Sequence, residues 1–183
     1  METMQMVTMT ASAAVMAGAL YSDVKQGRIP NALTYPAILL GLALGFATGG
    51  LGGFVSSLQG FGLGFLILFL GMMFGGIGGG DVKLAAGLGA LTGLHATILG
   101  LLYMGLLSGV MALGIMIWKG KLLRSLKNMW RYIFTSLVPF LEPEELDEQN
   151  SDAFPLGVAI VGGWAWALVE IQLGVGSFLG LDF

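Results

Sequence analysis

Apolar stretches of membrane-spanning length dominate this sequence. Six of them can be read along its 183 residues, at about Met4–Leu20, Ile29–Thr48, Val55–Phe74, Val82–Gly93, Ala96–Trp118 and Leu156–Ile171. A helix needs roughly 20 apolar residues to cross the hydrocarbon core of a bilayer. Charged residues make up only 10% of the chain and the mean hydropathy is +0.85, values that exclude a water-soluble globular protein. The sequence therefore predicts an all-α polytopic membrane bundle, forming a single domain over residues 1–183.

The fourth apolar stretch is short, but the fifth follows it at once. Between Lys83 and Lys119 lie 35 residues, which suit two spans of about 17 residues joined by a tight turn near Gly93 and His95. One straight helix of that length would protrude far beyond the bilayer. We therefore expect six transmembrane helices.

The positive charges support the same count. With six spans, all lysines and arginines fall on one side of the membrane: Lys25, Arg28, Lys83, Lys119, Lys121, Arg124, Lys127 and Arg131. The positive-inside rule makes that side cytoplasmic, so we expect both termini outside the cytoplasmic (inner) membrane of the cell. The first apolar stretch is preceded by Glu2 and by no basic residue, which favours a retained span over a secretory signal peptide.

Residues 119–153 follow a different pattern. Apolar residues recur there at helical spacing, while the opposite face carries Lys121, Arg124, Lys127 and Arg131. This pattern indicates an amphipathic helix at the cytoplasmic membrane surface. An acidic run at residues 142–152 comes next and is expected to be a solvated loop.

Few ionisable side chains remain in or beside the spans, and such groups are costly at membrane depth. His95 and Glu170 are expected near interfacial water on the outer side, in structural roles. Asp23 is expected just after the first helix and Asp81 just before the fourth, both at the cytoplasmic edge. Each begins an Asp-Val-Lys tripeptide, and the two carboxylates form the candidate site.

The glycines before Asp81 fit a peptide better than a phosphate. Gly78, Gly79 and Gly80 have no side chains, so a neighbouring backbone or an extended ligand can approach the carboxylate. A phosphate-binding P-loop needs a lysine after its last glycine, and the dinucleotide motif GxGxxG needs a glycine where Asp81 stands. An anion would be repelled by the carboxylate.

Two carboxylates within hydrogen-bond reach cannot both ionise easily, so they are expected to share one proton. The ionised member can take a proton from water while the protonated one polarises a peptide carbonyl, which is aspartic-protease chemistry. Pro30 is well suited to begin the second span sharply after the Asp23 loop. Lys25, Arg28 and Lys83 either set the topology, tune the ionisation of the aspartates or contact substrate.

Two segments resemble the signature motifs of the type IV prepilin peptidases. These are DVKQGRIPN at Asp23–Asn31 and GGGDVKL at Gly78–Leu84, the second containing the GxGD motif. The segment Phe154–Ile160 also resembles the closing Pro-x-Gly-x-Ala helix of that family. The resemblance implies that Asp23 and Asp81 are the catalytic pair, and candidate substrate-binding or supporting residues around them are Gly78, Gly80, Lys83, Pro30 and Asn31.

The same resemblance implies a substrate, namely precursors of type IV pilins or related prepilin-like proteins. They would be cleaved at the cytoplasmic membrane face between a short basic leader and a hydrophobic helix. Larger family members add a cysteine tetrad and methylate the new N-terminus, but this chain contains no cysteine. It therefore looks like the short, peptidase-only form, similar to the Tad/Flp and archaeal preflagellin peptidases, and no methyltransferase activity is expected. Its partners are expected to be the prepilin and the lipid bilayer, with no nucleic acid, cofactor or metal.

Other functions remain open from the residues alone. A small proton- or cation-coupled transporter could use the same carboxylates, although transporters usually bind near the bilayer midplane. A metal-dependent hydrolase would need more oxygen ligands than Asp23 and Asp81 offer. A non-catalytic scaffold would gain little from two charges at this depth. The oligomeric state is not predicted.

Overall fold

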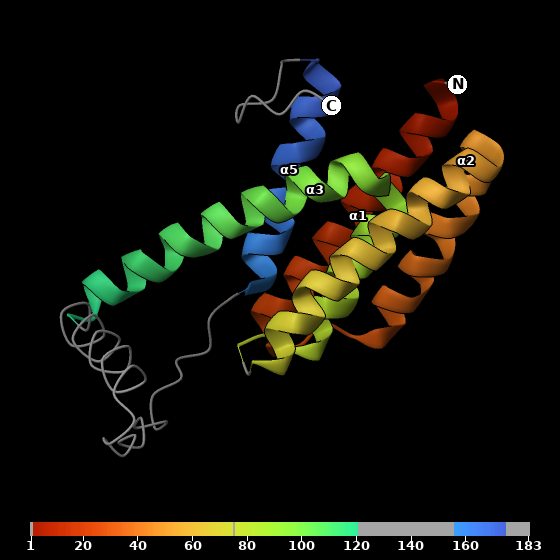
Figure 1. The fold of residues 1–183 in the computed structure, drawn as a ribbon. Helices are drawn as coiled ribbons and strands as arrows, with labels where there is room; N and C mark the ends of the chain where they lie inside the picture. Colours follow the sequence, from red (N-terminus) through yellow and green to blue (C-terminus); the bar gives the residue numbers. More distant parts are fainter. Residues whose placement is uncertain (1, 75, 121–155, 175–183) are drawn as a thin grey trace, which may run out of the picture. The chain divides into compact units, whose positions relative to one another are not determined.

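The computed structural model describes residues 2–74, 76–120 and 156–174 of the chain. Its elements are α1 (Glu2–Gln26), α2 (Asn31–Met73), α3 (Gly79–Trp118) and α5 (Leu156–Leu173), drawn in Figure 1. Within these ranges every regular element is a helix, which confirms the all-α prediction. Apart from Lys119 and Gly120, the segment predicted as an amphipathic helix and acidic loop lies outside the described residues.

Three of the described helices are long and apolar enough to cross a membrane: α2, α3 and α5. The chain is therefore a membrane protein, as predicted. α1, which carries Asp23 and Lys25 in its last turns, is not one of the three. Six membrane crossings stay a prediction.

Glycines with left-handed backbone conformations break both of the long helices. Gly50 has φ 57° within α2, and Gly93 has φ 77° within α3. Residues with a Cβ rarely adopt positive φ, so glycine is the residue that allows a reversal there. The break at Gly93 lies where a turn was predicted between the fourth and fifth apolar stretches. The break at Gly50 separates the predicted second and third stretches.

After Gly50 the chain turns back on itself, so that α2 forms a helical hairpin (Figure 1). Gly45 packs against Gly53 and Ser57 across this turn. The rings of Phe46 and Phe54 meet edge to face with centroids 6.5 Å apart. The absence of a side chain at Gly45 and Gly53 is what lets the two halves approach this closely.

The chain divides into two compact units, Met1–Leu107 with Pro155–Phe183, and Ser108–Phe154. The described part of the second unit is the end of α3 and the two residues after it, residues 108–120. All of the packing discussed below lies within the first unit.

The first half of α3 is the core of that unit. It is buried without interruption from Leu84 to Leu91, so it lacks the polar face of a surface helix. Small residues let the halves of α2 come close to it: Gly64 packs on Ala85, Gly60 on Gly89, and Gly41 on Ala90. Lipid supplies no hydrophobic force between helices, so such close backbone contacts are a main source of packing energy in membranes.

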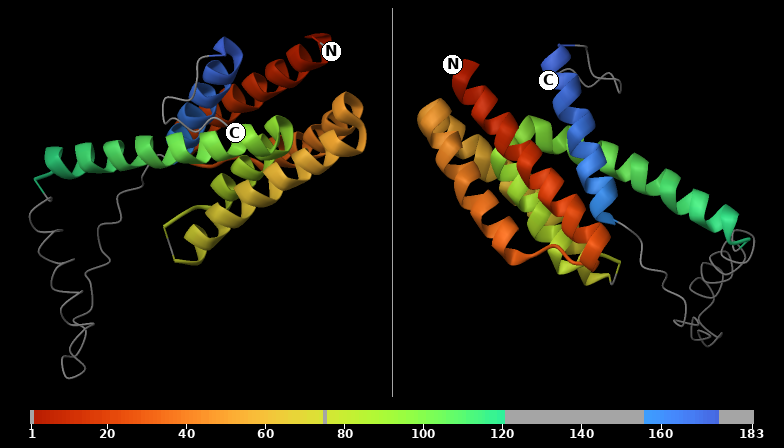
Figure 2. Two further views of the ribbon diagram at one scale, coloured as in Figure 1. Left: turned by 45° about the horizontal axis from the view of Figure 1, so that its top comes forward. Right: turned by 180° about the vertical axis from the view of Figure 1, so that it is seen from behind.

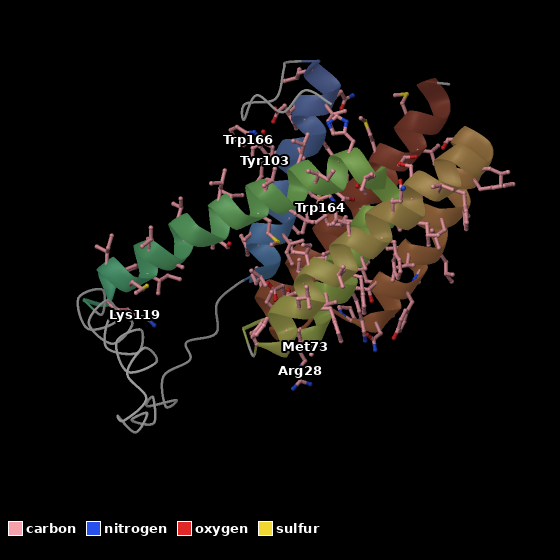
Figure 3. The ribbon with its side chains drawn as sticks, viewed as in Figure 1. Arg28, Met73, Tyr103, Lys119, Trp164 and Trp166 are labelled. Atoms are coloured by element: carbon pink, nitrogen blue, oxygen red, sulfur yellow. The ribbon has the colours of Figure 1, made fainter. Side chains whose placement is uncertain are left out.

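α5 packs against the part of α3 that follows Gly93. The indole of Trp164 lies over Gly100, and Gly163 packs on the backbone of Met104. Farther along, the hydroxyl of Tyr103 donates a 2.5 Å hydrogen bond to Glu170, and the ring of Trp166 lies 6.2 Å from that of Tyr103 (Figure 3).

The position of Glu170 corrects one expectation. Glu170 was expected to reach interfacial water, but only 8% of its surface is exposed. The hydroxyl of Tyr103 supplies a hydrogen bond that water would otherwise give, which reduces the cost of burying a polar group there. This contact is consistent with the structural role predicted for Glu170. His95, two residues after the break at Gly93, is exposed.

Candidate active site

The candidate site lies where three helix ends meet in the first unit. Asp23 is in the last turn of α1, Asp81 is in the first turn of α3, and Gly157 is in the first turn of α5. The views in Figures 1 and 2 agree that these three ends lie at the same end of the unit. Residues that are far apart in the sequence therefore share one site.

Asp81 is held by the glycines that precede it. Its backbone N–H donates to the carbonyl of Gly78 at 3.1 Å, and its carboxylate accepts a hydrogen bond from the N–H of Gly78. The second bond is one half of a capping box, in which the side chain of the third helical residue reaches back to the N–H of the residue before the helix; Gly78 has no side chain to supply the other half. Asp81 was expected just before its helix, but the cap places it within the first turn, where a carboxylate is favoured by the helix dipole.

Asp23 differs in a similar way from the expectation. The apolar stretch ends at Leu20, yet α1 continues to Gln26, so Asp23 is helical instead of following the helix. Polar residues can continue a helix once it leaves the apolar region. The helix ends at Gly27, which has φ 60° and whose N–H donates to the carbonyl of Asp23 at 2.8 Å.

The two carboxyl groups interact electrostatically. Asp23 and Asp81 are both half-buried, and they are close enough for their charges to repel each other. They come from separate helices, so their separation can change by small shifts of α1 or α3. The structure thus brings the predicted pair of aspartates into one site.

The linker between α1 and α2 lies against the start of α3. Pro30 is the residue before α2, with φ −71° and ψ 141°, and its carbonyl accepts the N–H of Leu33 at 3.0 Å. Ile29 is buried, and a Cβ added to Gly80 would lie 3.3 Å from that of Ile29. The space expected at Gly80 for a neighbouring backbone is thus taken by the linker, whereas Gly78 is exposed beside the Asp81 carboxylate.

Lys83 connects α3 to the start of α2. Its ammonium group donates a 2.9 Å hydrogen bond to the Oδ1 atom of Asn31. The same group lies 5.3 Å from the centre of the Tyr35 ring, in a cation–π arrangement. Two of the predicted supporting residues, Lys83 and Asn31, are therefore in direct contact with each other.

The described residues contain no group of three or more histidine, aspartate and glutamate side chains gathered as metal ligands. Within the described residues, the site offers two carboxylates, Asp23 and Asp81, which lie on different helices. Such a pair suits the sharing of a proton between two acids more than the coordination of a hard cation, which takes six or more oxygen ligands.

Sequence reasoning gave no role in the site to Gly157. A Cβ added to Gly157 would lie 2.5 Å from Oδ2 of Asp23, so the side chain of Asp23 rests directly on this part of α5. The available signal was the likeness of Phe154–Ile160 to a Pro-x-Gly-x-Ala segment. That likeness says nothing about which residue the glycine meets.

Comparison with known families decides what kind of protein carries this site. A model described as the type IV leader peptidase family matches residues 10–113, more than half of the chain and a range that contains both aspartates. The chain belongs to the type IV leader peptidase family. The leader peptidase family implies a peptidase and is membrane-associated, in agreement with the three apolar helices. No curated protein and no solved structure matches the chain. Gly157 lies beyond the matched residues.

Proposed function

We propose that the protein is a membrane aspartyl endopeptidase that removes the leader from type IV prepilin-like precursors, with Asp23 and Asp81 as its catalytic pair. The observation that carries this proposal is that two half-buried carboxylates from separate helix ends repel each other in a member of a peptidase family. The reaction requires two acids that share one proton, and two aspartates that interact electrostatically in one site are the candidates for such a pair.

In the proposed reaction, a water molecule between the carboxyl groups attacks the carbonyl carbon of the scissile peptide bond. The ionised aspartate accepts a proton from the water while the protonated aspartate donates a hydrogen bond to the carbonyl oxygen. A C–O bond forms and a tetrahedral intermediate results. The intermediate then collapses, the C–N bond breaks, and the proton passes to the leaving amine.

The position of the site supports a substrate that itself enters the membrane. The aspartates lie at the ends of α1 and α3, so a peptide bond beside a hydrophobic helix could reach them while that helix stays in lipid. Lys25 is in the last turn of α1, Arg28 follows that helix and Lys83 is near the start of α3, so these positive charges belong to the helix ends that carry the aspartates, which supports a cytoplasmic location for the site. We further propose that the protein lies in the cytoplasmic (inner) membrane with both termini on the outer side. We also propose that it cleaves its substrate without methylating the new N-terminus, since the cysteine tetrad is absent.

The proposal is tested by Asp23→Asn and Asp81→Asn variants, each purified in detergent and mixed with prepilins that carry their leader and helix. Asparagine keeps the size of the side chain but cannot accept a proton from water, so cleavage should fall by at least about a hundredfold in each variant. His95→Gln is the control, since His95 is exposed and outside the site, and it should cleave normally. Undiminished cleavage by either asparagine variant would rule out the two-aspartate mechanism.

A further inference from the structure

The first turn of α5 is in contact with one of the proposed catalytic groups. Gly157 is buried, and a Cβ built on it would lie 2.5 Å from Oδ2 and 2.9 Å from Cγ of Asp23. Real Cβ atoms essentially never approach other atoms within 3.0 Å. Any residue other than glycine would therefore displace the Asp23 carboxylate or push α5 away from α1.

This contact differs from those of the other tightly packed glycines. Gly163 in α5 meets the backbone of Met104, and Gly60 and Gly89 meet each other's backbones, so these glycines serve helix packing. Gly157 instead meets the ionisable end of a side chain. Glycine is a weaker helix former than alanine, and at this position the space left by its missing side chain is occupied by a carboxylate.

We infer that Gly157 is a positioning residue of the active site, and that the first turn of α5 sets the direction in which Asp23 presents its carboxylate to Asp81. The inference rests on the proposed catalytic role of Asp23. Asp23 is near the end of α1, one turn before the chain leaves the helix at Gly27, so α1 alone restrains it weakly. The first N–H groups of a helix have no partner within it, which makes the start of α5 a favourable neighbour for a carboxylate.

The kinetic test compares Gly157→Ala with Gly162→Ala. The added methyl at residue 157 should displace Asp23 and lower kcat for prepilin cleavage about ten- to a hundredfold, since a shift of about 1 Å in a catalytic group has effects of this size. KM and the thermal unfolding temperature should stay close to wild type. At Gly162 the methyl meets only the end of the Leu107 side chain, at 3.0 Å, so this variant should retain its kcat. Full kcat in Gly157→Ala would overturn the inference.

A second test needs no enzymatic activity. The chain has no cysteine, so an Asp23→Cys/Gly157→Cys double variant contains a single possible disulfide. The Cβ of Asp23 lies 3.4 Å from the position of a Cβ on residue 157, close to the roughly 3.5–4.5 Å found in disulfides. In the full-length protein in detergent, mild oxidation should protect both thiols from a maleimide–polyethylene glycol reagent.

The matched control for the cross-link is Asp23→Cys/Gly162→Cys, whose second cysteine lies more than one turn farther along α5. Its thiols should stay free under the same oxidation. The inference would be overturned if the thiols of both double variants were equally protected from the maleimide reagent. It would also be overturned if the thiols of Asp23→Cys/Gly157→Cys were not protected at all. If the cross-link forms as expected but Asp23→Asn still cleaves prepilin, the proposed function fails while the contact with α5 stands.

Discussion

Lys83 connects the start of α3, which carries Asp81, to the start of α2. It lies two residues after Asp81, and it contacts Asn31 and Tyr35 at the start of α2. The contact holds the first turn of α3 against the helix that follows the Asp23 linker. These contacts predict that Lys83 supports the site indirectly, by holding the start of α3, and with it Asp81, in place beside the linker.

This role is checked by a double-mutant cycle of Lys83→Ala and Asn31→Ala. Hydrogen bonds to charged groups contribute about 1.5–3 kcal/mol, and partial exposure of this pair lowers the expected coupling to about 0.5–1 kcal/mol. The measurement is the free energy of unfolding of the single and double variants in mixed micelles. Additive effects of the two substitutions would show that the contact contributes nothing. Lys25→Ala is a suitable control, since Lys25 bonds only to Tyr21 within α1 in the contacts described.

The aspartates could be singled out from the sequence, whereas Gly157 could not. Asp23 and Asp81 each stand in a short local motif, and charge is scarce enough in this chain to make them conspicuous. The meaning of Gly157 depends on a contact between helices at opposite ends of the chain, and no local pattern contains it. The burial of Glu170 was missed for the same reason, because its partner Tyr103 lies on another helix.

Among the helices, the breaks were more predictable than the exact ends. Gly93 was expected to interrupt a stretch too long for one span, and it does so with a positive φ. The ends of α1 and α3 extend past the apolar residues, because capping and hydrogen bonding set them instead of hydropathy. The glycine pairs that meet, such as Gly60 with Gly89, depend on how the two halves of α2 are aligned along α3, which hydropathy does not determine.

That alignment predicts a contrast between two glycines of the same helix. A Cβ at Gly60 would overlap the carbonyl oxygen of Gly89, whereas one at Gly62 would meet nothing within 4 Å. Gly60→Ala should therefore destabilise the protein by about 1–3 kcal/mol through overpacking. Gly62→Ala should be neutral or stabilising by up to about 1 kcal/mol, since alanine favours the helix. Thermal unfolding in detergent measures both, and equal stability of the two variants would contradict the packing of α2 on α3.

For the whole molecule, the arrangement of the first unit constrains its orientation in the membrane. The N–H of Leu94 donates to Ser56 at 3.3 Å, so the break at Gly93 lies beside the beginning of the second half of α2. The breaks within α2 and α3 thus lie at one end of the unit. The end of α1 and the start of α3, which carry the aspartates with Lys25 and Lys83, lie at the other (Figures 1 and 2). Positive charge favours the cytoplasmic side, which predicts that the two breaks face outward.

Single cysteines introduced into this cysteine-free chain can test that orientation. Thr48→Cys and His95→Cys place exposed thiols beside the outer breaks, and Gln26→Cys and Met73→Cys place them at the end that carries the aspartates. In spheroplasts of an expressing bacterium, a membrane-impermeant maleimide should label the first pair directly and the second pair only after permeabilisation. Labelling of Gln26→Cys and His95→Cys from the same side would contradict the proposed topology. Because the two members of each pair come from different helices, agreement within a pair also checks that α2 and α3 share the orientation on which a cytoplasmic site depends.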